Sequence, residues 1–101
     1  WLAILFSHVR VPLAASGGIH GPEDALKAVM AGASAVQMVS ALLQRGPAAL
    51  TAVRDGMARW LEEHEYESLE QARGSLSLLR CPNPAAFERA NYMRVLQGWK
   101  F

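Results

Sequence analysis

The sequence lacks the features that mark several large classes of protein. It has one cysteine, Cys81, in 101 residues, so it cannot form an internal disulfide, and this favours a reducing, cytoplasmic setting. Its three histidines and single cysteine follow no zinc-binding spacing, so we expect no metal site. Its longest apolar stretches fall far short of the ~20 residues that cross a bilayer, and we therefore expect no membrane partner.

Charge of one sign is also scarce. Ten Lys and Arg stand against nine Asp and Glu, a net charge of +1, which creates no field that would attract nucleic acid. Apolar residues, in contrast, make up 51% of the chain, which is high for one small domain. We therefore expect part of this apolar surface to meet protein that the sequence does not encode. The chain starts at Trp1 rather than Met and is expected to be a piece of a longer protein.

Two short apolar stretches, residues 11–16 and 35–40, have the length and composition of strands. Between them Gly21 and Pro22, followed by two acidic residues, predict the start of a helix, and Gly32 predicts its end. A connection of this length is too long for a hairpin, so the two strands are predicted to be parallel. Residues 11–42 thus form a strand–helix–strand unit, and the fold class is α/β.

Helices are predicted on both sides of this unit. Residues 1–8 are apolar on all sides through Phe6, which is typical of the end of a buried helix. Residues 46–101 are predicted to be a helical C-terminal region. Its signals are Gly46-Pro47, a capping box from Ser68 to Gln71, an Asn83-Pro84 cap, and an apolar stripe formed by Leu50, Val53, Met57, Trp60 and Leu61.

A sheet of two parallel strands has two open edges and needs cover on both faces, so it is not a self-sufficient design. Either a partner supplies neighbouring strands, including self-association through the open edges, or the chain is the end of a longer barrel.

Small residues follow both predicted strands: Ser16-Gly17-Gly18 after the first, and Ser40-Ala41 after the second. Glycine lets backbone N–H groups point into a cavity, and such groups beside a helix start favour an anion. In eight-stranded barrels the recurrent phosphate site lies after strands seven and eight with a short extra helix, which here would begin near residues 41–42. Because a Gly-Gly pair after a strand is also an ordinary turn, spacing alone leaves both readings open.

Residues 12–20, 23–33 and 35–42 resemble the C-terminal end of dihydroorotate dehydrogenase-like flavoproteins. The tail, at residues 64–68, 73–77 and 87–93, is similar to the branch often labelled dihydroorotate dehydrogenase-like protein. The resemblance implies the last two strand–helix units of a TIM (β/α) barrel, followed by a helical tail.

The same resemblance implies that the chain binds the phosphate of FMN. Its positions matching the family's phosphate site are Gly17, Gly18, Val39 and Ser40, where Val39-Ser40 replaces the commoner Gly-Thr. The family's catalytic base, its flavin-ring lysine and its pyrimidine-binding asparagines have no counterpart here, so we predict no catalytic residue and no activity for the chain alone. The parent would be an FMN-dependent oxidoreductase of pyrimidine biosynthesis that acts on CH–CH bonds.

Two other readings stay open from the residues. One is a non-catalytic interaction module whose strand edges add to a partner's sheet. The other is the phosphate-binding end of a barrel enzyme that uses a sugar phosphate or nucleotide rather than flavin.

Overall fold

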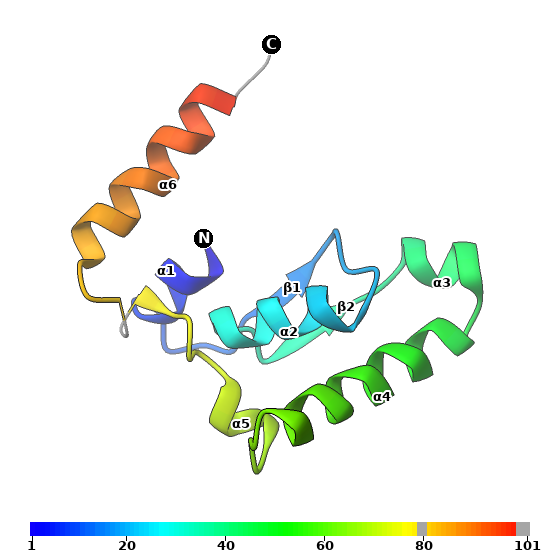
Figure 1. Ribbon diagram of the computed structural model, residues 1–101. Helices are drawn as coiled ribbons and strands as arrows, with labels where there is room; N and C mark the ends of the chain where they lie inside the picture. Colours follow the sequence, from blue (N-terminus) through cyan, green and yellow to red (C-terminus); the bar gives the residue numbers. More distant parts are fainter. Residues whose placement is uncertain (79–80, 99–101) are drawn as a thin grey trace.

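The computed structural model describes residues 1–78 and 81–98, so the predicted helical region 46–101 includes five residues, 79–80 and 99–101, outside the described part. Strands β1 (Ala14–Ser16) and β2 (Ala35–Gln37) pair in parallel, with Ala14 opposite Ala35 and Ser16 opposite Gln37. Helix α2 (Pro22–Ala31) makes the crossover between them (Figure 1). The predicted strand–helix–parallel strand unit is confirmed.

Local signals account for both ends of α2. Gly21 is the N-cap in an extended conformation, Pro22 opens the first turn, and Glu23 and Asp24 lie near the positive end of the helix dipole. Gly32 ends the helix at φ 132°, a value that side chains resist, and its N–H donates to the carbonyls of residues 28 and 29. The helix therefore has the start and the end that the sequence predicts.

Both strands are shorter than predicted, because each strand extends only over the residues that are paired with the other. The Ser34 N–H donates to the Leu13 carbonyl at 2.7 Å just before the paired residues, while Pro12 has no N–H and Val11 is exposed. At the other end Gly17 turns away at φ 87°. Residues 38–40 have no β1 partner, and the expectation of a strand through residue 40 is wrong.

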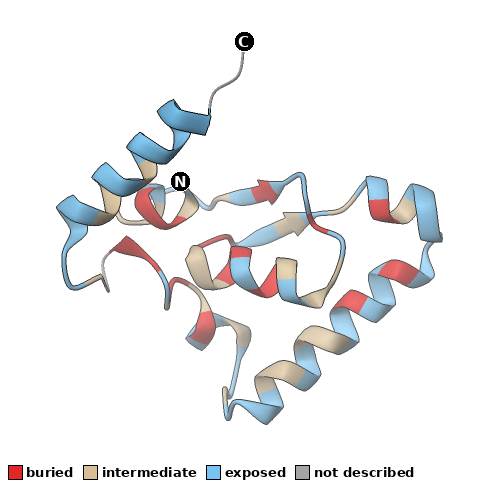
Figure 2. Cartoon of the chain, turned by 45° about the horizontal axis from the view of Figure 1, so that its top comes forward, coloured by how far each residue is buried: buried red, intermediate tan, exposed pale blue. Residues whose placement is uncertain are grey.

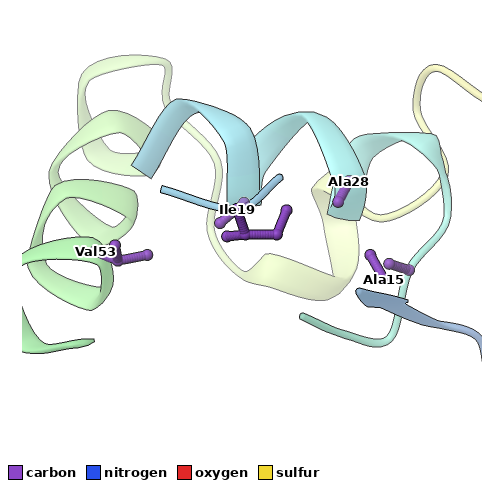
Figure 3. Packing of buried hydrophobic residues seen from close by; sticks show 6 residues of the cluster. Ala15, Ile19, Ala28 and Val53 are labelled. Atoms are coloured by element: carbon purple, nitrogen blue, oxygen red, sulfur yellow. The ribbon is translucent and has the colours of Figure 1, made fainter. Parts of the chain in front are cut away.

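The two faces of the sheet differ. Ala15 lies in a core cluster with Ile19, Ala28 and Val53 (Figure 3). Val36 is partly buried and packs against this cluster. The four strand residues that point to the other face are exposed: Ala14, Ser16, Ala35 and Gln37. The helices thus cover one face of the sheet only.

The core is made mostly of alanines. Among the described residues, the buried set comprises Ala3, Ala15, Ala25, Ala28, Ala33, Ala41, Ala49 and Ala72 with a few larger side chains, Ile4, Ile19, Leu26, Val29, Val53 and Leu78. Alanine allows close approach of helices but removes little apolar area from water. Large apolar side chains such as Leu43, 83% exposed, and Val11, 66% exposed, stay on the surface. The core is thin for a chain so rich in apolar residues.

Helices α1 (Leu2–Phe6), α3 (Ser40–Arg45) and α4 (Ala48–Glu63) flank the unit. In α1 only Ala3 and Ile4 are buried, while Leu5 is 42% exposed, so the prediction of a helix end buried on all sides is wrong: neighbours cover one side of it. On α4, Val53 is buried but Leu50 is exposed, so the predicted stripe is only partly core. Four residues of this stripe border an apolar hollow of about 300 Å³ between α4 and β2: Leu50, Val53, Met57 and Leu61.

The chain after α4 returns to the start of the fold. The Ser68 side chain caps α5 (Leu69–Ala72), as its capping box predicts. The next segment donates from the N–H groups of Gly74 and Leu76 to the carbonyls of Val29 and Met30, at 3.1 and 2.8 Å. We call residues 73–78 the strap, because they close the C-terminal end of α2.

Helix α6 (Pro84–Gly98) projects from the rest of the fold and contains no buried residue among those described (Figures 1 and 2). Its position accounts for a radius of gyration of 14.9 Å, above the ~13 Å typical of 100 compact residues. Within residues 1–78 and 81–98, none of the helices has both the length and the apolar content needed to cross a membrane.

Candidate phosphate site at the strand ends

The carboxyl ends of β1 and β2 lie at the same edge of the sheet, because the strands are parallel and in register. Gly17 and Gly18 follow β1 directly, at φ 87° and 74°, and both are exposed. A Cβ built on either glycine would meet nothing within 4 Å. The positive φ values favour glycine at both positions, and the space beside the two residues is open to a ligand.

Ile19 holds this glycine loop on the fold. Its side chain is only 8% exposed and lies in the core cluster between α2 and the Val53 side of α4 (Figure 3). The residue next to the exposed glycines is therefore fixed by packing. A loop anchored in this way keeps its backbone donors in place before any ligand arrives.

The second half of the site begins α3. Val39 is the N-cap residue, with its side chain 66% exposed, and Ser40 is the first residue of the helix. Both residues were expected at the end of a strand, and the short helix was expected one residue later. The helix starts at Ser40 because β1 no longer offers a partner to the chain beyond Gln37. Gly17, Gly18, Val39 and Ser40 thus follow adjacent strand ends.

These two segments have the donors that a phosphate needs. Among the turn and loop hydrogen bonds of residues 1–78 and 81–98, none is donated by the N–H of Gly17 or Gly18. No side chain caps the first turn of α3, whose leading N–H groups have no partner within the helix. Exposed N–H groups at a glycine turn and unpartnered N–H groups at a helix start are suited to an oxyanion. The residues present fit a phosphate group.

Sequence reasoning missed the contacts that link the two segments. Arg45, at the end of α3, donates from Nη2 to the carbonyl oxygen of His20 in the loop after β1. The His20 N–H in turn donates to Oδ2 of Asp24 at 3.1 Å. In the sequence, Asp24 is only one of the two acidic residues that follow Pro22 at the start of the helix. No local signal marks a contact between positions 20 and 45.

Comparison with known protein families agrees with this geometry. A family model described as dihydroorotate dehydrogenase matches residues 2–61, more than half of the chain. The chain belongs to the dihydroorotate dehydrogenase family. The matched range runs from α1 to near the end of α4 and contains all four predicted phosphate residues. Helices α5 and α6 lie beyond it, so the resemblance of the tail to one branch of the family stays a prediction.

Curated relatives carry the same family name. The chain is 44% identical over 68 residues to the catalytic subunit of dihydroorotate dehydrogenase B (NAD(+)) of Pelobacter propionicus, covering 67% of this chain and 22% of that protein. It is 42% identical over 65 residues to the dihydroorotate dehydrogenase (quinone) of Erythrobacter litoralis, covering 64% and 19%. The mitochondrial quinone enzyme of Arabidopsis thaliana is 32% identical over 66 residues, covering 65% and 14%. The chain thus spans about a fifth of the length of the first two relatives.

Proposed function

We propose that this chain holds the phosphate of FMN in a dihydroorotate dehydrogenase-like oxidoreductase. The proposal rests on one observation: the carboxyl ends of two adjacent parallel strands lead into the exposed Gly17-Gly18 turn and into the uncapped start of α3. The N–H groups of Gly17 and Gly18 donate none of the turn and loop hydrogen bonds of the described residues. Membership of the family supports FMN as the source of the phosphate. The backbone around Val39 and Ser40 supplies the second set of donors, and the Ser40 hydroxyl adds one more.

The same piece belongs, in this proposal, to a (β/α) barrel of which β1 and β2 are the last two strands. Helices cover one face of the sheet, and the other face carries exposed, mostly small residues that suit a packed barrel interior. The apolar hollow beside β2, bordered by Val36, Met38 and Met57, is where a further strand–helix unit would pack. The rest of the barrel would therefore cover the apolar surface that this chain exposes.

When bound, FMN would supply the redox chemistry for the oxidation of a dihydropyrimidine such as dihydroorotate. This chain's residues bind and orient the phosphate end of the cofactor. The family's base, flavin-ring lysine and pyrimidine-binding asparagines have no match in the sequence, so we propose that the chain alone is inactive. Cofactor retention is therefore the property by which to test it.

The experiment uses the longest natural protein that carries this sequence, with Gly18→Val as the test variant. A charge-assisted hydrogen bond to phosphate contributes about 1.5–3 kcal/mol, so losing one weakens FMN binding about tenfold to a hundredfold. Valine also resists φ 74° at this position. We expect the variant to purify without its yellow colour and to bind added FMN weakly in a flavin fluorescence titration.

Gly46→Val is the matched control. Gly46 has φ 78°, its Cβ would also meet nothing within 4 Å, and it lies at the opposite end of α3. It therefore matches Gly18 in positive φ and in free space around the Cβ, and it is not one of the proposed donors. If Gly18→Val keeps full flavin occupancy, the phosphate assignment is wrong. Binding of a sugar phosphate but not FMN would favour a non-flavin barrel enzyme.

A further inference from the structure

The loop after β1 is held at both sides of a single peptide residue, His20. Its carbonyl oxygen accepts from Nη2 of Arg45, and its N–H donates to the carboxylate of Asp24 at 3.1 Å. The residue before it, Ile19, is buried in the core cluster. The backbone just after the glycine pair is therefore fixed by one packing contact and two charge-assisted hydrogen bonds.

Arg45 also ties this loop to the other half of the candidate site. It is the last residue of α3, whose first residue, Ser40, offers the second set of donors. Six helical residues span only about 9 Å, so the position of Arg45 sets that of Ser40 closely. A guanidinium stays charged at all ordinary pH values and presents several donors in a fixed plane, which suits a bond to a carbonyl on another segment.

We propose that Arg45 and Asp24 form a clamp on His20 that positions the glycine loop against the start of α3, so that both sets of N–H groups bind the same phosphate. The proposal rests on the proposed function and adds two positioning residues to it. Neither side chain needs to touch the cofactor. Asp24 carries a negative charge near the loop, so its direct electrostatic effect would weaken the binding of a phosphate. Its proposed role as an anchor of the loop would strengthen that binding.

That opposite sign gives a decisive test. If charge alone mattered, Asp24→Ala would bind FMN more tightly, because it removes a carboxylate near a phosphate. The clamp predicts the reverse, since the His20 N–H loses its acceptor and the loop loosens. Asp24→Asn keeps an acceptor oxygen without the charge and should restore most of the affinity. Arg45→Gln should weaken binding about tenfold, the loss expected for one hydrogen bond to a charged group.

The readouts are the FMN dissociation constant and amide hydrogen exchange of residues 17–21 in the flavin-free form of the longest natural protein. We expect Arg45→Gln and Asp24→Ala to raise exchange in this loop several-fold and to weaken FMN binding. Arg94→Gln is the control for loss of one arginine charge, because Arg94 is exposed on α6. It should change neither readout.

Three results would overturn the proposal or part of it. Unchanged loop exchange in Arg45→Gln would show that the clamp does not order the loop. Unchanged or tighter FMN binding by Asp24→Ala would show that the hydrogen bond from the His20 N–H to Asp24 does not support FMN binding. If the unsubstituted protein binds no FMN, the proposed function fails and the phosphate role of the clamp fails with it, while the exchange data still decide whether the clamp orders the loop.

Discussion

Replacing Gly74 by alanine should destabilise the protein more than its backbone conformation alone explains. Gly74 has φ 75°, and a Cβ there would lie 2.5 Å from Cε1 and 2.7 Å from Cζ of Phe6. Gly18 has φ 74°, and a Cβ there would meet nothing within 4 Å. The two glycines therefore match in φ and differ in whether a methyl group has room.

The ring of Phe6 is confined by close neighbours and cannot move away easily. Gly32 approaches its other side, where a Cβ would lie 2.6 Å from Cβ, Cγ and Cδ2 of the same residue. An ordinary contact with a methyl group at position 74 would require the ring to move by roughly 1 Å. In a close-packed interior such a shift would disturb the other contacts of the ring. The unfavourable φ costs about 1–2 kcal/mol in either variant, and overpacking adds about 1–3 kcal/mol at Gly74 alone.

The assay is urea unfolding of the flavin-free protein, followed by tryptophan fluorescence. We expect Gly18→Ala to lower the free energy of unfolding by about 1–2 kcal/mol and Gly74→Ala by about 2–5 kcal/mol. In a Phe6→Leu background the extra loss at Gly74 should largely vanish, because the ring edge that blocks the methyl group is gone. Equal losses for the two alanine variants in the unsubstituted protein would refute the steric argument.

Two further substitutions test the packing and capping of α4 and α5. Gly56→Ala would gain about 1 kcal/mol of helix propensity, but it should be destabilising in a thermal melt, because its Cβ would clash with the Cβ and Cγ atoms of Pro22. Pro22→Ala should relieve this penalty. Ser68→Ala should cost about 1 kcal/mol and speed hydrogen exchange of the Gln71 amide, which donates to Ser68 Oγ at 3.2 Å; exchange at the unsubstituted rate would contradict the cap.

The sequence predicts the elements whose signals are local. Gly21 and Pro22 open α2, Gly32 closes it, and Ser68 caps α5, each as expected, because these residues act within one turn of their own position. The parallel pairing also follows, since the length of the connection excludes a hairpin.

Strand length and burial depend on residues far away in the chain and are predicted less well. β2 ends at Gln37 because β1 turns away at Gly17, and Leu50 is exposed because nothing in the described residues covers the hollow beside it. The bond from Gly74 N–H to the Val29 carbonyl and that from Arg45 to His20 join distant positions. Neither has a local pattern, so both the strap and the clamp emerge only from the structure.

The two devices lie at opposite ends of a very short sheet. The strap, Phe6 and Gly32 lie where the chain approaches the strands, whereas the glycine loop and α3 follow the strands' carboxyl ends. Three residues of strand separate them by only about 10 Å, yet each has its own anchors. If the ends act independently, Gly74→Ala lowers stability and leaves the FMN affinity of the folded protein unchanged, whereas Arg45→Gln weakens FMN binding with little effect on unfolding. A loss of both properties in both variants would mean that strap and clamp belong to one cooperative unit, and that the phosphate site depends on the packing of α1.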